Sequence, residues 1–532
     1  MTCAKFIRTV LSVLLVLSML ALAACGDGGD TSSTASSSQE TAPFDENNIV
    51  ANMAVISDVH LSYANHTEET IAYNIERYAR AVGNLYNMTD GKLDAVMMCG
   101  DYTSHGIPEQ ARTFASATKE IFGGIFGENC PKLCIGMGNH DTHWGRCMKP
   151  GEWYSLLGSY GLNAGLEADS LLDEGDLHLT LKAGDRTYHI LYIETFSYAT
   201  NEFTQATMSW LNSTLKKLTA DDPDQFVFIG THGPIAESGV FGSDIELDAG
   251  ADWATAKGNL DSVLKRYPQA VIFSGHTHYT ERLETSIMQR NYTALNVAAL
   301  FGECYCNSSY TTMLDGTSAY GMNGMGMGYL LELDINGSLR IRRIDFGQSG
   351  NAATVTGTVT KREKCDNVED SDNVATAVCG KVTLTDDKTV AFFEEPWVIP
   401  APDADKKFLK CYSDKRGKKG GPTFPKDVAP SINKLGREIS VYFPAAVSGN
   451  CGKILRYFIS IYNENGDLIY ENLAMGNFMP LKTGVCDGTD HTDATTFLYK
   501  ITDCPSASSY SATIVAQDEF GNKSKSLTCS LS

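Results

Sequence analysis

Five short apolar stretches of this sequence end in residues that bind metals or move protons. They read MAVISDVH, LDAVMMCGD, KLCIGMGNHD, FVFIGTHGP and AVIFSGHTH. Their polar ends supply carboxylates, imidazoles and one amide, from Asp58, His60, Asp101, Asn139, His140, Asp141, His232, His276 and His278. Such a mixed nitrogen and oxygen set suits zinc, manganese or iron, whereas an oxygen-only set would favour magnesium or calcium. The pattern therefore predicts a site for a borderline divalent metal.

The spacing of these residues indicates more than one ion. Asp58 and His60 lie two positions apart, as do His276 and His278, so each pair falls on one side of a strand or of its extension. The candidate ligands are Asp58, His60, Asp101, Asn139, His232, His276 and His278. Because this set is too large for one tetrahedral ion with an open position, we expect two divalent ions that share a carboxylate.

An α/β domain would bring these side chains together. From Ile49 to Ile344 short apolar runs alternate with amphipathic stretches, which predicts strands alternating with helices. Leu211, Leu215 and Leu218 share one face of a predicted helix, and a second helix is expected over residues 260–267. Because sites in α/β sheets form outside the carboxyl ends of strands, the five polar ends should meet at one rim.

The ordered motifs DxH, GDx, GNHD, a single histidine and GHxH resemble the calcineurin-like metallophosphoesterase superfamily from Asp58 to His278. The resemblance implies a four-layer α/β/β/α sandwich. It also implies one metal held by Asp58, His60 and His278, a second held by Asn139, His232 and His276, and Asp101 as the bridge between them. His140 would stabilise the transition state or protonate the leaving oxygen, and Asp141 would orient His140 by a hydrogen bond.

The implied activity is hydrolysis of a phosphate monoester or diester. A hydroxide bridging two divalent ions (Mn, Fe or Zn) would attack phosphorus, and the ions would stabilise the developing charge. The substrate could be a small phosphoester, a nucleotide or a lipid, and the sequence does not distinguish among them. The alternative is a non-catalytic surface binding or adhesion protein on a vestigial phosphoesterase scaffold.

Two departures from related motifs narrow the resemblance. Purple acid phosphatases have glycine at the position of His60 and a ligating tyrosine at the position of Ser104. The common variant GDxTDxG appears here as GDYTSHG, which moves His105 toward the loop. We interpret His105 as a solvated loop residue, with a substrate contact as the open alternative.

The C-terminal part of the chain has the pattern of β-structure. Thr- and Val-rich strands follow Asp345, and we assign residues 46–405 to the phosphoesterase domain. Residues 406–428 are rich in Gly, Pro and Lys and are interpreted as a linker. Residues 429–532 alternate as in a small all-β sandwich and resemble fibronectin type III domains, with a hairpin expected at Asn465–Gly466.

The N-terminus has the order of an export signal. Lys5 and Arg8 precede an apolar run, and LAAC at residues 22–25 resembles the bacterial lipobox. We therefore expect a signal peptide over residues 1–24, lipid on Cys25 and a flexible Ser/Thr/Gly tether over residues 25–45. The protein would then be exported and anchored to the outer face of a bacterial membrane, at the cell surface or in the periplasm.

Charge and cysteine content limit the partners. Lysines and arginines number 43 against 64 acids, and the net charge of −21 argues against genomic nucleic acid as a partner. Cysteine pairing stays open at the sequence level. Cys365 with Cys379, and Cys504 with Cys529, are candidate disulfides, while Cys130, Cys134, Cys304 and Cys306 offer an alternative zinc site.

Overall fold

The structure is a computed structural model of the 532-residue chain. It describes residues 44–531 apart from 62–66, 143–147, 195, 198–201, 236–258, 279, 290, 301–310, 313–325, 364–373, 403–419, 450–451, 477–494 and 503. The expected signal peptide, the lipidation site at Cys25 and almost all of the tether lie outside the described residues, as do Cys304, Cys306 and Cys365.

The first of two six-stranded sheets has the order β19-β14-β13-β1-β2-β3. β1 (Ile49–Ile56), β2 (Ala95–Met98) and β3 (Lys132–Ile135) are parallel, so their carboxyl ends lie at one edge. β13 (Met327–Asp334), β14 (Leu339–Asp345) and β19 (Phe392–Ile399) extend the sheet in antiparallel pairing beyond β1.

The second sheet has the order β10-β11-β9-β8-β5-β4. β5 (Arg186–Ile193), β8 (Val227–Thr231), β9 (Ala270–Ser274) and β11 (Thr293–Asn296) form its parallel centre. β4 (Leu177–Ala183) and β10 (Ile287–Gln289) pair antiparallel at the two edges. The strands β8 and β9 therefore end at the same rim of this sheet.

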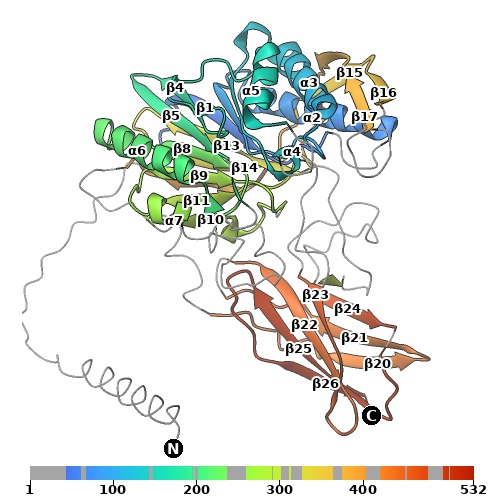
Figure 1. The fold of residues 1–532 in the computed structure, drawn as a ribbon. Coiled ribbons are helices and arrows are strands. Elements are labelled where there is room, and N and C mark those ends of the chain that lie inside the picture. Colours follow the sequence, from blue (N-terminus) through green and yellow to red (C-terminus); the bar gives the residue numbers. More distant parts are fainter. Residues whose placement is uncertain are drawn as a thin grey trace, which may run out of the picture. The chain divides into compact units, whose positions relative to one another are not determined.

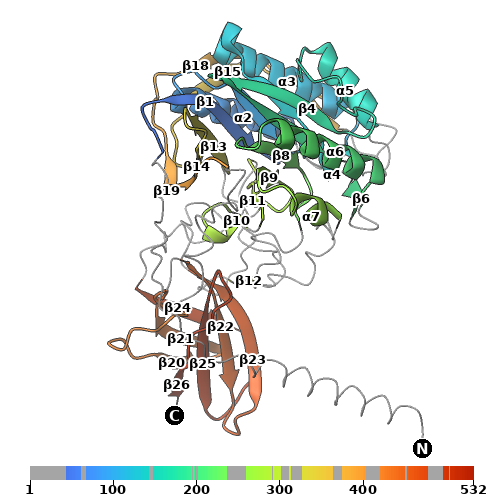
Figure 2. The same ribbon diagram turned by 90° about the vertical axis from the view of Figure 1, so that its left-hand side faces the viewer.

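Alternating apolar side chains stack the sheets into four layers. On β5, Ile190 belongs to the core between the two sheets, while its neighbour Leu191 packs in the outer core under helices α6 (Gln205–Asp221) and α7 (Asn259–Leu264). On the other side α2 (Glu68–Met88), α3 (Pro108–Phe126) and α5 (Pro150–Ser159) cover the first sheet (Figures 1 and 2). The predicted α/β/β/α fold is confirmed.

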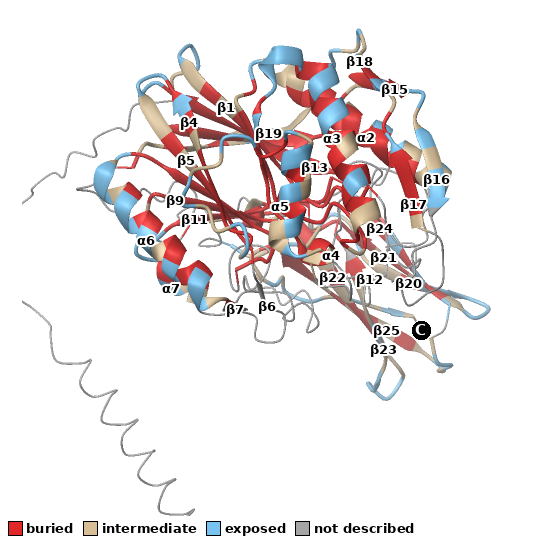
Figure 3. Cartoon of the chain, turned by 45° about the horizontal axis from the view of Figure 1, so that its top comes forward, coloured by how far each residue is buried: buried red, intermediate tan, exposed pale blue. Residues whose placement is uncertain are grey.

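The helices begin where the sequence provides caps. The Thr67 side chain accepts a hydrogen bond from the Thr70 backbone N–H at the start of α2, and Pro108 opens α3. Leu211, Leu215 and Leu218 of α6 are buried, as their spacing predicts. The helix expected over residues 260–267 is shorter, because α7 ends at Leu264 and the chain continues as a tighter turn. Figure 3 shows the strands buried and the outer helix faces exposed.

Two small antiparallel pairs follow the first sheet. β15 (Ala353–Thr356) pairs with β18 (Lys381–Leu384), and β16 (Val359–Glu363) pairs with β17 (Val374–Val378). They pack on α2 and α3, where the Ala377 backbone N–H donates a hydrogen bond to the Thr113 hydroxyl. The Thr- and Val-rich strands predicted after Asp345 are therefore present and cover helices of the phosphoesterase region.

The C-terminal region is all-β and has its own core. One sheet contains β20 (Ser431–Leu435), β21 (Glu438–Pro444) and β24 (Thr496–Ile501). The other contains β12 (Thr311–Thr312), β23 (Leu468–Met475), β22 (Ile454–Tyr462), β25 (Tyr510–Asp518) and β26 (Leu527–Leu531). The predicted hairpin is present between β22 and β23, with Gly466 at φ 81°. The domain boundaries remain predictions.

The candidate disulfides are not formed by the cysteines that the structure describes. Cys379, Cys504 and Cys529 are free thiols, which corrects the pairing of Cys504 with Cys529 and leaves Cys379 unpaired. Cys504 lies in the segment after β24, whereas Cys529 lies within β26. No described helix is both long enough and apolar enough to cross a bilayer.

Candidate metal centre

The polar side chains predicted to meet do lie together at the carboxyl ends of five strands. Asp58 and His60 follow β1, Asp101 follows β2, and Asn139 begins the short helix α4 (Asn139–Thr142) after β3. In the second sheet His232 follows β8, while His276 and His278 follow β9. Because both sheets direct their parallel strands to the same rim, residues more than 200 positions apart become neighbours.

Asp58, His60 and His278 form the first group. His278 Nε2 lies 3.0 Å from Asp58 Oδ1 and 3.2 Å from His60 Nε2. Asp58 and His60 are buried, and His278 is half-buried. One oxygen and two nitrogens therefore point at a common centre, at the separations that ligands adopt around a divalent cation.

Asp101, His232 and His276 form the second group, and the Asn139 amide joins it. Asn139 Oδ1 lies 2.8 Å from both His232 Nε2 and His276 Nδ1, and these two nitrogens lie 3.2 Å apart. His232 donates Nδ1–H to the Cys99 carbonyl at 2.7 Å, because a carbonyl oxygen can only accept. Its Nε2 atom is therefore the one that faces the group.

Asp101 lies between the two groups. Its Oδ2 atom is 3.1 Å from His232 Nε2 in the second group and 3.9 Å from His60 Nε2 in the first. Its other oxygen, Oδ1, accepts a hydrogen bond from the His140 backbone N–H at 2.8 Å. This bond fixes the carboxylate in an orientation that reaches both groups.

The backbone at this rim is unusual. Seven non-glycine residues with positive φ occur in the described parts of the chain, and five of them are candidate ligands, namely Asp58, His60, Asp101, His276 and His278. Left-handed backbone is costly for residues with a Cβ, so it persists only where the surroundings hold it. Here it turns side chains from successive strand ends toward one point.

Glycines make room for this arrangement. A Cβ on Gly138 would collide with the Asp101 carboxylate. A Cβ on Gly100, which has φ 92°, would lie 2.7 Å from His232 Nδ1. Glycine is therefore required at both positions, because the backbone passes directly beside two candidate ligands.

The charge states of the donors fit metal binding. Burial lowers the pKa of His60 and of His276 to about 3, so both rings are neutral and offer lone pairs. Burial acts in the same direction on His232, but the charges of Asp101 and Asp58, together with the hydrogen bonds to Asp101 and to the Cys99 carbonyl, outweigh it and raise the pKa of His232 to about 10. Burial raises the pKa of Asp101, but the charges of His232 and His140 outweigh it, and the pKa lies well below its usual range.

Residues 51–280 match the protein family described as Calcineurin-like phosphoesterase. These residues are therefore similar to a calcineurin-like phosphoesterase domain. The match includes every candidate ligand and covers less than half of the chain. It points to a hydrolase of phosphoric esters and to a family that normally uses two divalent metals.

No curated protein sequence matches the chain. Similar solved structures include a purple acid phosphatase from yellow lupin (Lupinus luteus) seeds, at 11% identity and TM-score 0.36, covering 57% of this chain and 53% of that one. Another is a 5'-nucleotidase from Candida albicans SC5314, at 11% identity and TM-score 0.30, covering 57% of this chain and 54% of that one. The chain spans about half the length of each.

His140 of the phosphoesterase domain lies beside the first group. Its ring contacts the His60 ring edge-on, with centroids 5.3 Å apart. His140 donates Nδ1–H to the Ser104 carbonyl oxygen at 3.0 Å, because that oxygen can only accept. Nε2 is therefore the atom through which His140 can exchange a proton with a bound molecule.

The expected role of Asp141 is corrected by its contacts. Its carboxylate accepts hydrogen bonds from four backbone N–H groups, those of Asp101, Tyr102, Thr103 and Gly138, and from the Thr103 hydroxyl. The Ser104 carbonyl occupies the position at His140 Nδ1 that was expected for Asp141. Asp141 therefore binds the loop that carries Asp101, rather than the imidazole itself.

The sequence analysis did not identify two groups at this centre, the Glu194 carboxyl group and the Ser104 carbonyl. Glu194 ends the apolar run HILYIE after β5, and its buried carboxyl group interacts electrostatically with His232. Burial raises the pKa of Glu194 well above its usual range. The position of Glu194 at a strand end could have indicated its role, whereas nothing in the sequence marked the Ser104 carbonyl.

His105 is half-buried at the approach to α3, where its backbone N–H donates to Gln110.

Burial marks the open side of the centre. Asp58, His60, Asp101, Asn139 and His232 are all at most 6% exposed. His140, His276 and His278 are half-buried. Among the described residues of the centre, these three imidazoles are the ones that retain access to solvent, which places the approach of a ligand on their side.

Proposed function

We propose that the phosphoesterase domain hydrolyses a phosphate monoester or diester with two divalent cations, drawn from manganese, iron and zinc. One observation carries the proposal. Two groups of donor atoms lie side by side, and the Asp101 carboxylate lies close to both. One group contains Asp58, His60 and His278, and the other contains Asp101, His232 and His276. A single structural ion would need neither two groups nor a carboxylate between them.

When bound, the two cations supply the positive charge that neutralises a phosphoryl group and the acidified water that hydrolysis needs. The residues of the chain set the geometry. Asp101 fixes the position of the two groups relative to each other. The low exposure of the donors excludes bulk water and strengthens each electrostatic contact. Asn139 contributes a neutral oxygen, so the second group has one carboxylate and does not accumulate further negative charge.

His140 is the acid of the proposal. The Ser104 carbonyl holds its Nδ1–H, so Nε2 is the atom presented on the open side of the centre. A protonated Nε2 there would hydrogen-bond a phosphoryl oxygen or give its proton to the leaving oxygen.

The test is turnover of bis-p-nitrophenyl phosphate beside p-nitrophenyl phosphate, by the full chain loaded with manganese, iron or zinc and analysed for metal content. We expect metal-dependent release of nitrophenolate. The ratio of diester turnover to monoester turnover would show which of the two ester classes the protein prefers. A protein with two bound metals that turns over neither ester would indicate a more selective substrate, whereas a protein without turnover and without bound metal would favour the alternative, a non-catalytic binding protein on this scaffold.

The location of the protein is also a proposal. We infer from residues 1–25 that the chain is exported and carries lipid on Cys25, with the fibronectin type III-like region as a surface module. Nucleotide or lipid phosphoesters at a membrane surface would then be within reach. Incorporation of radiolabelled palmitate into the wild-type chain, and its absence in Cys25→Ser, is the expected result.

A further inference from the structure

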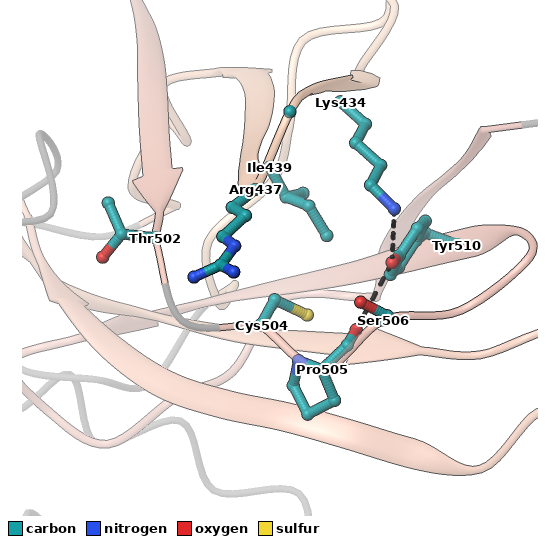
Figure 4. Close-up of a pocket in the computed structure, with 9 residues that line it drawn as sticks. Lys434, Arg437, Ile439, Thr502, Cys504, Pro505, Ser506 and Tyr510 are labelled. Carbon is teal, nitrogen blue, oxygen red and sulfur yellow. Dashed lines mark hydrogen bonds between the residues drawn. The ribbon is translucent and has the colours of Figure 1, made fainter.

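A cavity in the C-terminal β-region is lined by residues between 434 and 510. Its volume is about 350 Å³, and its chemistry comes from Lys434, Arg437, Thr502, Cys504, Ser506 and Tyr510 (Figure 4). This volume is within the range of small-molecule sites, which is about 300–1,000 Å³. None of the predicted metal ligands lines the cavity.

One wall of this cavity is cationic. Lys434 and Arg437 flank the tight turn between β20 and β21, where Gly436 takes φ 62°. The Lys434 ammonium donates a hydrogen bond to the Tyr510 hydroxyl at 3.0 Å and lies 4.8 Å from the centre of that ring. These contacts hold the ammonium at the cavity, while the residue as a whole stays exposed.

The second cation of the wall is available for a ligand. Within the parts of the chain that the structure describes, the Arg437 guanidinium has no ion pair or hydrogen bond, and no carboxylate lines the cavity. In a protein with a net charge of −21, two cations gathered at one cavity, with no carboxylate among its described lining residues, form a locally basic surface.

Hydroxyl groups also line the cavity. The Tyr510 hydroxyl accepts from the Ala507 backbone N–H at 2.7 Å and from Lys434, and it donates to the Pro505 carbonyl oxygen at 3.3 Å, so it is fixed in place and its proton is already used. Thr502 and Ser506 add two further hydroxyls. A guanidinium fork, an ammonium and these two hydroxyls together offer more donors than the two oxygens of a carboxylate can accept, whereas phosphate presents three or four oxygens.

We propose that this cavity binds the phosphate group of a small phosphorylated molecule, with Arg437 and Lys434 as its charge partners. The site is separate from the metal centre and does not depend on the hydrolytic activity proposed above. It would let the C-terminal region recognise phosphate-bearing material independently of the phosphoesterase domain.

Cys504 provides a local readout, because its half-buried thiol lines the cavity. The full chain is alkylated with iodoacetamide, and labelling of Cys504 and Cys529 is followed by peptide mass spectrometry. The probe is methylphosphonate, which a phosphoesterase cannot hydrolyse, and acetate at equal ionic strength is its carboxylate counterpart. Cys529 in β26 is the internal reference, since it does not line the cavity.

We expect methylphosphonate at ten times its dissociation constant to slow Cys504 labelling about tenfold and to leave Cys529 unchanged. Arg437→Ala should abolish the protection, and Lys500→Ala, which removes an exposed lysine from β24 outside the cavity, should retain it. Circular dichroism would verify that both variants are folded. Equal protection by acetate, undiminished protection in Arg437→Ala, or no protection by methylphosphonate would each overturn the proposal.

Discussion

Asp101 Oδ2 lies 3.1 Å from Nε2 of His232, and both side chains are buried at the rim where the two sheets meet. The pair links the first sheet to the second, since Asp101 follows β2 and His232 follows β8. A proton on His232 stabilises the pair in the absence of metal, whereas a cation must replace that proton. The chemistry of the centre therefore depends on pH.

Metal affinity should rise with pH. Burial lowers the pKa of His232, but the nearby carboxylates and hydrogen bonds, with Asp101 foremost among them, together outweigh it and raise that pKa to about 10, so a proton must leave when the second group binds a cation. Below that pKa one released proton gives about a tenfold gain in affinity per pH unit. Zinc calorimetry in two buffers of different ionisation enthalpy should show proton release, and a pH-independent affinity would contradict the charge state assigned to His232.

Asp101→Asn should lose at least about a hundredfold in kcat/KM. The substitution removes the charge between the two groups, so bound metal should also fall below two ions per chain. Asp90→Asn is the matched control, because Asp90 also has positive φ but is exposed at the end of α2. The metal content and the initial rate of hydrolysis are measured on the same preparations of each variant. Full activity in Asp101→Asn would refute a bridging role.

His140→Ala should reduce turnover while leaving the metal content unchanged. Because the proposed role is proton donation, the loss should be at least about a hundredfold for an alkyl phosphoester, whose leaving oxygen needs a proton. It should be smaller for a p-nitrophenyl ester, whose leaving group departs as the anion. Equal losses on both substrates would instead assign His140 to binding the phosphoryl group.

Asp141→Ala should act mainly on stability. Four backbone N–H groups and one hydroxyl donate to this buried carboxylate, and each buried donor left unsatisfied costs about 1–3 kcal/mol. Denaturant unfolding should therefore show a loss of about 3 kcal/mol or more, accompanied by weaker metal binding. Asp185→Ala, at an exposed turn between β4 and β5, should change stability by less than about 0.5 kcal/mol. Unchanged stability in Asp141→Ala would contradict the structural role assigned to Asp141.

The composition of the centre was predictable from the sequence. Each candidate ligand directly follows an apolar run such as MAVI or VFIG, and such runs form buried parallel strands because both of their faces pack against other layers. Parallel strands end at one rim, so the strand ends were expected to meet, and the family resemblance implied that Asp58 and His278 fall in one group. The resemblance also implied the four-layer fold, whereas the hairpin at Gly466 follows from a local pattern.

The contacts within the centre were not predictable in the same way. Whether Asp141 binds His140 or the backbone of residues 101–103 depends on how two loops from different strands pass each other. Cys504 and Cys529 are free thiols for the same reason, since pairing depends on where strands place them and not on their number. The cavity beside Arg437 also has no signature in the order of the residues.

The sequence by itself therefore determined which donor atoms are present and at which strand ends they lie, because strand periodicity and turn residues act over a few positions. Only the tertiary structure decided that Asp101 stands between two groups, that the Ser104 carbonyl holds His140, and that five ligands adopt left-handed backbone. These features come from packing between segments far apart in the chain, where the geometry of the whole fold determines each contact.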